Sequence, residues 1–139
     1  MILNQLANHQ LNTMKRIIYI LVVGLLLVFC SYSFISGDDD VSRDINQAIC
    51  LGQSDHIAGY FAPEVVLGVQ GEDHNCPKEQ AELALKEFFR RNTPSQFLCT
   101  TGSCYISGKL VTSAGKSYKL DYTLKTVDNK TFITNIHIY

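Results

Sequence analysis

The stretch CPKEQAELALKEFFRRN, residues 76–92, carries the clearest periodic pattern in the chain. Its apolar side chains recur at spacings of three and four residues, which places on one stripe of a helix Ala81, Ala84, Leu85 and Phe88. Pro77 suits the first turn of such a helix, and Pro94 forbids its continuation. A helix of this length is only marginally stable alone. The apolar stripe therefore predicts a second layer of structure that covers it.

A leader precedes the part of the chain that is predicted to fold. Residues 17–29 form an uncharged apolar run that directly follows a basic pair, and two small serines come after it. This layout is typical of a secretory signal peptide, here with cleavage after Ser33. Met14 immediately precedes the basic pair. We therefore interpret residues 14–33 as the signal peptide and residues 1–13 as an upstream mis-start.

Two alternatives to a cleaved signal stay open. Residues 27–30 resemble a bacterial lipoprotein box in which Cys30 would be acylated, although Phe29 is larger than the residue usually found before that cysteine. The uncharged stretch also continues to Ile35, which approaches the roughly 20 residues of a membrane-spanning anchor. All three interpretations place residues 38–139 outside the cytoplasm, because the basic pair stays inside. We expect an exported protein of the periplasm or cell envelope that meets the membrane only through this segment.

The composition of the rest of the chain predicts one domain without a nucleic-acid partner. A chain of 139 residues, 46% of them hydrophobic, has room for a single globular core. From Gly37 onward, 10 basic and 13 acidic side chains give a net charge of −3. Such a domain lacks the basic surface that binds phosphate backbones. We therefore expect a single domain over residues 38–139.

Four cysteines follow the leader, an even number that an oxidising compartment would allow to form two disulfide bonds: Cys50, Cys76, Cys99 and Cys104. Cys99 and Cys104 flank a short loop, and a bond across this hairpin would add about 2 kcal/mol. A bond between Cys50 and Cys76 would close a longer loop and add about 3.5 kcal/mol. We favour the hairpin bond, whereas for Cys50 and Cys76 a bond and buried free thiols are equally open.

Two helices and a strand are predicted before the central helix. A helix beginning at Asp40 or Ser42 has its apolar residues at helical spacing and ends at Gly52. A short helix from Ser54 would bury Ile57 before a proline breaks the run. Apolar residues then alternate over residues 64–70, which is typical of a strand, and residues 71–75 are predicted to be a polar connection.

Four strand-like runs follow Pro94, at residues 96–99, 104–112, 116–127 and 131–139. In the third run one face carries Tyr118, Leu120, Tyr122 and Leu124, and the other carries Lys119, Asp121, Thr123 and Lys125. This alternation predicts a sheet with one covered and one solvated face. Helices followed by an antiparallel meander indicate an α+β fold, in which a cone-like curved antiparallel sheet packs on the N-terminal helices.

The passages AICLGQSDHIAGYFAPEVVLGV and QAELALKEFFRRNTPSQF, at residues 48–69 and 80–97, resemble the nuclear transport factor 2-like superfamily. More narrowly, they resemble the exported bacterial domains grouped as domain-of-unknown-function family 4783. The matching residues are Ala48, Gly52, Tyr60, Phe61, Val65, Leu67, Gln80, Ala81, Phe88, Phe89, Asn92 and Pro94. The resemblance covers residues 42–139 and implies four or five antiparallel strands curled around helices, often with a pocket between them and often in a dimer. It supplies no catalytic residues.

The pocket that the resemblance implies would be lined by Tyr60, Phe61, Phe88, Tyr118, Tyr122 and Ile136. Ketosteroid isomerases of this superfamily combine a carboxylate base with a tyrosine and a protonated acid in an apolar cavity. Asp121 lies on the opposite strand face from these tyrosines, which weakens that analogy. We favour the interpretation that the tyrosines are core aromatics with hydroxyl groups at the rim.

No cluster of residues predicts a metal, a cofactor or a catalytic nucleophile. Asp73, His74 and Cys76 lie close together in sequence, and Asp55 and His56 lie elsewhere, but a metal needs three or four converging ligands. A cysteine two residues from a histidine matches no nucleophile motif. The last histidine, His137, shares a strand face with Asn135 and Tyr139, and we expect an exposed or interface residue there.

Three functions are consistent with these observations. The first, which we favour, is an exported non-catalytic domain that binds a small ligand or an envelope protein through its pocket or its sheet face. The second is a small enzyme of isomerase or hydrolase type that uses the same pocket. The third is a structural homodimer in which the outer strand face of one copy meets that of the other, through Lys119, Asp121, Thr123, Lys125, Asn135 and His137.

Overall fold

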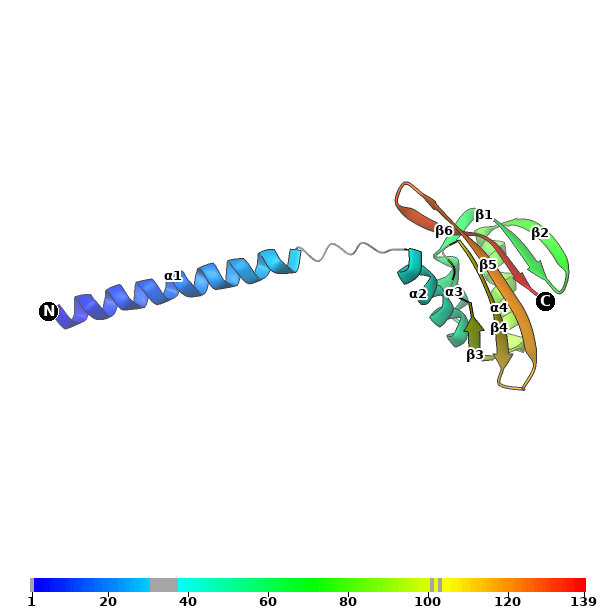
Figure 1. The fold of residues 1–139 in the computed structure, drawn as a ribbon, viewed down its shortest axis with the longest axis horizontal. Coiled ribbons are helices and arrows are strands. Elements are labelled where there is room, and N and C mark those ends of the chain that lie inside the picture. Colours follow the sequence, from blue (N-terminus) through cyan, green and yellow to red (C-terminus); the bar gives the residue numbers. More distant parts are fainter. Residues whose placement is uncertain (1, 31–37, 101, 103) are drawn as a thin grey trace. The chain divides into compact units, whose positions relative to one another are not determined.

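The structure is a computed structural model that describes residues 2–30, 38–100, 102 and 104–139 (Figure 1). The chain divides into two compact units, Met1–Ile35 and Ser36–Tyr139. In the first unit, helix α1 spans Ile2–Cys30. Within the described ranges, no helix combines the length and apolar character that crossing a membrane requires. The predicted cleavage site after Ser33 lies outside the described residues, and acylation of Cys30 stays a prediction.

The second unit contains three helices and six strands, which are α2 (Asp38–Leu51), α3 (Ser54–Ala58), β1 (Phe61–Val69), β2 (Glu72–Pro77), α4 (Lys78–Arg91), β3 (Pro94–Cys99), β4 (Tyr105–Thr112), β5 (Ser117–Val127) and β6 (Lys130–Ile138). The strands form one curved sheet in the order β2-β1-β6-β5-β4-β3 (Figure 1). The predicted α+β class is confirmed. The sheet differs from the expectation in having six strands and a parallel pair, β1 with β6.

The core lies between the helices and one face of the sheet, which we call the inner face. Helix α4 buries Ala81, Leu85, Phe88 and Phe89. The predicted apolar stripe is therefore buried except for Ala84, which is partly buried, and Phe89 is added to it. Strands β5 and β6 supply the inner face, with buried Leu120, Tyr122, Leu124, Ile133, Ile136 and Ile138. Residues that alternate with these along the strands form the outer face.

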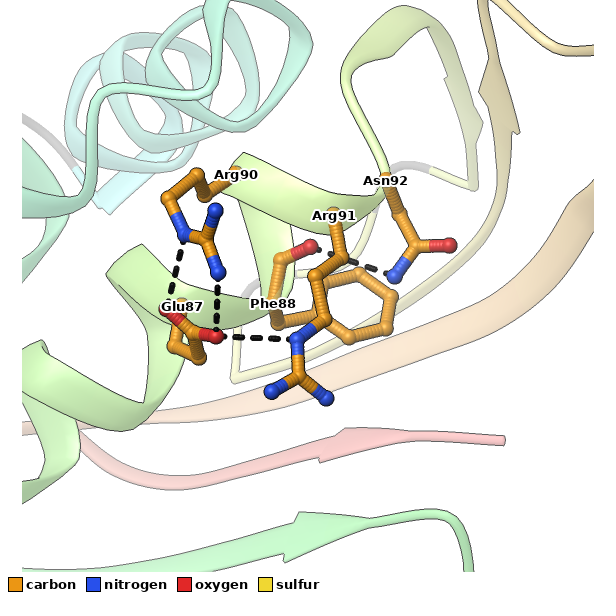
Figure 2. Close-up of polar contacts among 5 residues, drawn as sticks. All are labelled: Glu87, Phe88, Arg90, Arg91 and Asn92. Atoms are coloured by element: carbon orange, nitrogen blue, oxygen red, sulfur yellow. Dashed lines mark hydrogen bonds and ion pairs between the residues drawn. The ribbon is translucent and has the colours of Figure 1, made fainter.

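Polar contacts fix the C-terminal end of α4 (Figure 2). The carboxylate of Glu87 accepts hydrogen bonds from Arg90 and Arg91, and these contacts lower its pKa to about 2. Asn92 Nδ2 donates to the carbonyl oxygen of Phe88 at 3.2 Å. The hydroxyl of Tyr118, on β5, donates to Asn92 Oδ1 at 2.8 Å. The Phe88 carbonyl also accepts from the backbone N–H of Asn92 at 2.8 Å, so Asn92 holds the last turn of the helix with two donors and joins the helix to the sheet through Tyr118.

The predicted turns are confirmed where glycine or asparagine permits a positive φ. Gly52 ends α2 with φ +66°. Asp128 and Asn129, with φ of 51° and 61°, join β5 to β6. Two consecutive positive φ angles are typical of the type I′ turn, whose twist matches that of a two-strand hairpin. This turn therefore fixes the register of the longest hairpin in the sheet.

The polar connection predicted at residues 71–75 is wrong, because these residues belong mostly to strand β2. Gln70 and Gly71, with φ of 57° and 92°, form a tight turn, and β2 then pairs antiparallel with β1. The side chains of β2 are mostly polar and mostly exposed, so the strand lacks the alternation that predicts strands. Backbone pairing with β1, and not side-chain burial, stabilises it.

The favoured hairpin disulfide is not formed in the structure, and of the two alternatives for Cys50 and Cys76 the structure has the one without a bond. Cys99 pairs with Gly108 across the β3–β4 hairpin, so Cys104 does not lie opposite it as the hairpin prediction required. Cys50 Sγ donates to the carbonyl of Ser95, and Cys76 Sγ donates to that of Val65, each at 3.8 Å. These two thiols therefore contact different strands of the sheet.

A candidate binding site on the outer face of the sheet

The six predicted pocket residues come together in the core. Phe61, Phe88, Tyr122 and Ile136 are buried, and Tyr60 and Tyr118 are half-buried. The Tyr118 ring packs edge to face on Phe88 with centroids 5.1 Å apart. The Tyr122 hydroxyl donates to Asn46 Oδ1 of helix α2 at 2.7 Å, and burial raises the pKa of this tyrosine. The interpretation as core aromatics describes this placement, and a role in ligand binding stays a prediction.

One of the six, Tyr60, belongs to a polar contact that joins α2 to the segment after α3. Its hydroxyl donates to the carboxylate of Asp44, which His56 Nε2 also contacts at 2.7 Å. The hydrogen bonds from Tyr60 and from His56 lower the pKa of Asp44. Burial, followed by the contact with Asp44, raises the pKa of Tyr60 to about 12. The phenol therefore stays a donor and the carboxylate an acceptor over the whole neutral range.

We expect the stabilising effect of Asp44 to depend on pH. Because its folded-state pKa lies below the ordinary value of 3.8, the ionised carboxylate stabilises the fold at higher pH and loses this effect as pH falls through the folded value. Asp44→Asn should therefore lower the free energy of unfolding at pH 7, by less than about 1 kcal/mol for so exposed a pair. Urea unfolding at pH 7, 5 and 3 should show the difference shrinking at the lowest pH. Tyr60→Phe, which removes the donor, should follow the same trend, and a difference unchanged at pH 3 would contradict the assignment.

The outer face carries a row of residues that are directly opposite one another on five adjacent strands. Asp73 of β2 pairs with Gly68 of β1, which pairs with His137 of β6. His137 pairs with Asp121 of β5, which pairs with Ser107 of β4. We call these five residues the outer row. It crosses the sheet at right angles to the strands and lies on the outer face, opposite the core.

The ionisable members of the outer row contact one another. His137 Nδ1 lies 3.1 Å from Asp121 Oδ1, and His137 Nε2 lies 3.4 Å from Asp73 Oδ1. Asp121 Oδ2 accepts a hydrogen bond from the Tyr105 hydroxyl at 3.0 Å and lies 3.9 Å from Lys119 Nζ. Asp121 is only 3% exposed, and the His137 side chain is 17% exposed. A nearly buried carboxylate on a sheet face predicted to be solvated is therefore the most unusual feature of the domain.

Gly68 makes the contact between Asp73 and His137 possible. A Cβ atom at position 68 would lie 2.3 Å from Asp73 Oδ1 and 2.5 Å from His137 Cδ2. Both distances are shorter than van der Waals contact, so any larger residue would displace one of the two side chains. The glycine leaves the space over β1 through which the carboxylate of β2 reaches the imidazole of β6.

The geometry favours hydrogen bonding over metal coordination. The two carboxylates contact opposite nitrogens of one imidazole ring, so they diverge from each other, whereas metal ligands must converge. Among the residues that the structure describes, no three His, Cys, Asp or Glu side chains could hold a metal ion. A protonated imidazole can donate to both carboxylates at once, whereas a neutral one can donate to only one. The hydrogen bond to Asp121, followed by burial, raises the pKa of Tyr105, which keeps this hydroxyl a donor.

A hollow of about 570 Å³ adjoins the outer row, over β3, β4 and β5. Its lining residues are Leu98, Cys99, Thr100, Ser107, Gly108, Lys109, Ser117, Tyr118 and Lys119. Ser107 belongs both to the outer row and to this lining, and Lys119 contacts Asp121. The outer row and the hollow therefore form one continuous site on the outer face.

Sequence reasoning placed part of this site and missed the rest. Alternation correctly put Asp121 and His137 on the outer face. Of the two expectations for His137, exposure is not met, because this side chain is mostly buried between two carboxylates, and a place in an interface stays a prediction. Asp73, taken as a loop residue, lies on β2. His74 is exposed beside Glu72 and lies outside the site. The glycine at position 68, inside a run of valines and leucine, was the available signal of a close approach across the strand.

Comparison with known proteins identifies the family. A family model described as "Domain of unknown function (DUF4783)" matches residues 42–139, and no curated protein matches the chain. The crystal structure of a DUF4783 family protein from Bacteroides ovatus is 29% identical, with a TM-score of 0.62, and the match covers 68% of this chain and 90% of that one. A DUF4783 family protein from Bacteroides fragilis is 27% identical, with a TM-score of 0.64 and coverage of 68% and 93%.

A more distant likeness concerns the fold alone. An NTF2-like protein of unknown function from Cytophaga hutchinsonii is 8% identical, with a TM-score of 0.50, and the match covers 73% of this chain and 88% of that one. The family match extends over more than two thirds of the chain and contains every strand of the sheet. The chain therefore belongs to the DUF4783 family, and its domain has the NTF2-like α+β fold.

Proposed function

We propose that this protein is an exported, non-catalytic domain that binds a small ligand on the outer face of its sheet. The observation that carries the proposal is the contact between the buried carboxylate of Asp121 and the mostly buried imidazole of His137 on that face. Burial removes the water that would hydrate this carboxylate on an exposed sheet face, and the loss of hydration costs free energy. It is held there by Tyr105 and Lys119, which contact Oδ2, and by His137, which contacts Oδ1. This arrangement keeps a fixed set of polar groups in place beside a hollow.

The inner face offers less support for binding. The aromatic residues expected to line a pocket there pack against one another, and the hydroxyl of Tyr122 is bonded to helix α2. A ligand would have to displace these contacts before it could enter. The hollow on the outer face needs no such rearrangement, and its size falls within the range of small-molecule sites, about 300–1,000 Å³.

The geometry of His137 favours binding over catalysis. In hydrolytic triads a carboxylate orients one imidazole nitrogen, and the other nitrogen faces the nucleophile. Asp121 could orient His137 in this way, but the second nitrogen faces the carboxylate of Asp73. A carboxylate there holds the ring in place and occupies the position in which a triad has its nucleophile. The contacts of His137 therefore support a positioning role.

Export is the second part of the proposal, and it rests on the apolar run after the basic pair in residues 14–33. Mass spectrometry of the mature chain from a bacterial host tests it. An N-terminus at Phe34 supports the cleaved signal, and an acylated Cys30 supports export as a lipoprotein. A chain recovered intact from the cytoplasm would contradict export.

The binding part is tested with a thermal-shift screen of envelope metabolites against the full chain. Ser107→Phe fills the outer row and the hollow without changing charge, and phenylalanine is well tolerated in strands. Leu83→Phe, on the exposed side of α4, is the matched control because Leu83 is 65% exposed. We expect a stabilising ligand to lose its effect on Ser107→Phe and to keep it on Leu83→Phe. Ligands that stabilise both variants equally would place binding elsewhere and contradict the proposal.

A further inference from the structure

We infer that the hollow on the outer face binds the carboxylate or phosphate group of a small organic ligand, between Lys109 and Lys119. The inference rests on the proposed function, because it names the chemistry of the ligand that the outer face would bind. Three features of the lining support it, namely its lysine pair, the sign of its charge and its apolar wall.

The two lysines are directly opposite each other in the antiparallel ladder of β4 and β5. Like charges in this position destabilise a sheet. The ammonium group of Lys119 is partly compensated by Asp121, at 3.9 Å, and by the Tyr139 ring, whose centroid is 5.5 Å away. Over the described part of the chain, Lys109 has no ion-pair partner. An anion between the two ammonium groups would relieve the repulsion and provide Lys109 with a partner.

The charge of the hollow is positive. Of the described residues that line it, two are lysines and none is acidic. The nearest carboxylate, that of Asp121, contacts donors with both of its oxygen atoms, so the positive charge of Lys109 is left for a ligand. The hydroxyl groups of Ser107 and Ser117 also line the hollow and are able to donate to an anion. Charged hydrogen bonds of this kind are stronger than neutral ones.

An apolar wall indicates that the ligand is larger than an inorganic ion. Leu98 lines the hollow and is 55% exposed, which leaves its side chain available to an apolar group. Leu98 pairs with Lys109 across the β3–β4 hairpin, so the apolar contact lies directly beside the positive charge. A ligand with an anionic head and a short apolar body would contact both the lysine pair and Leu98.

The inference is tested by titrating the full chain with benzoate, phenyl phosphate and benzyl alcohol, which share a ring and differ in the charged group. We expect binding of at least one of the two anions, and the one that binds more tightly identifies a carboxylate or a phosphate as the preferred head. Lys109→Gln and Lys119→Gln should each weaken that binding about tenfold or more, as expected for the loss of one charge-assisted hydrogen bond. Lys125→Gln removes the same charge from β5 outside the hollow and should change the affinity less than twofold.

Stability measurements separate lost binding from lost folding. Lys109→Gln removes one of two like charges that are directly opposite, so its Tm should equal or exceed that of the unaltered chain. If benzyl alcohol binds as tightly as the anions, or the lysine variants bind them as tightly as Lys125→Gln does, the inference is wrong. In that case the proposed function would still stand if Ser107→Phe abolished the binding of these probes. Binding that Ser107→Phe leaves unchanged would overturn both.

Discussion

Replacing Phe88 with alanine is expected to lower the free energy of unfolding by about 3 to 5 kcal/mol, the usual range for a large aromatic residue in a core. Phe88 is 6% exposed and lies toward the C-terminal end of the apolar stripe of α4. Its ring contacts Tyr118 of β5 and Phe89 edge to face, with centroids 5.1 Å and 5.9 Å away. Truncation would leave a cavity between helix and sheet and would remove both contacts. Urea unfolding of the full chain, followed by circular dichroism, measures the loss.

The matched control for this experiment lies on the same helix. Leu83 is 65% exposed, so Leu83→Ala should change the free energy of unfolding by no more than about 0.5 kcal/mol. Both substitutions place alanine in the same helix, so their difference reports burial and not helix propensity. Equal effects of the two substitutions would show that α4 does not pack through Phe88.

The elements that could be predicted from the sequence are those whose signals are local. Helix α4 has apolar residues at helical spacing and prolines at both ends, and strand β5 alternates over its whole length. The β5–β6 turn follows from Asp128 and Asn129, which tolerate positive φ. Each of these patterns depends on residues that are close together in the sequence. Their interpretation therefore required no knowledge of the rest of the chain.

Pairing between distant segments could not be predicted in this way. Strand β2 has low strand propensity and exists because β1 offers it a free edge. The parallel pairing of β1 with β6 joins residues separated by more than sixty positions. The predicted hairpin disulfide failed for a different reason, because the register of the local β3–β4 hairpin places Gly108, and not Cys104, opposite Cys99.

The candidate site is the product of this long-range register. Alternation assigned Asp121 and His137 to one face, but only the pairing of β5 with β6 makes them directly opposite. A slip of one residue would turn either side chain to the inner face. The parallel pairing of β1 then aligns Gly68 with His137, which brings in Asp73. Sequence reasoning therefore identified the residue types and their face, but not their contacts.

Replacing Asp121 with alanine is expected to lower the free energy of unfolding by about 2 to 3 kcal/mol, as for a buried charged acceptor. The substitution removes the acceptor of the Tyr105 hydroxyl. It also leaves the mostly buried imidazole of His137 in contact with one carboxylate in place of two. Thr123→Ala is the control, because Thr123 lies two residues away on the same strand and the same face. Its effect should be well below 1 kcal/mol. Chemical denaturation at pH 7 compares the two.

A double-mutant cycle shows whether Asp121 acts through His137. If the two side chains stabilise the fold as a pair, the effects of Asp121→Asn and His137→Gln should not add, and the cycle should give a coupling energy above about 0.5 kcal/mol. The same cycle between Asp121 and Asn135, which is opposite Thr123 and not opposite Asp121, should give a value near zero. Additive effects in both cycles, with Asp121→Ala no worse than Thr123→Ala, would mean that Asp121 is solvated like the rest of the outer face. The buried charge that supports a binding site there would then be absent, and the proposed function would lose its main structural support.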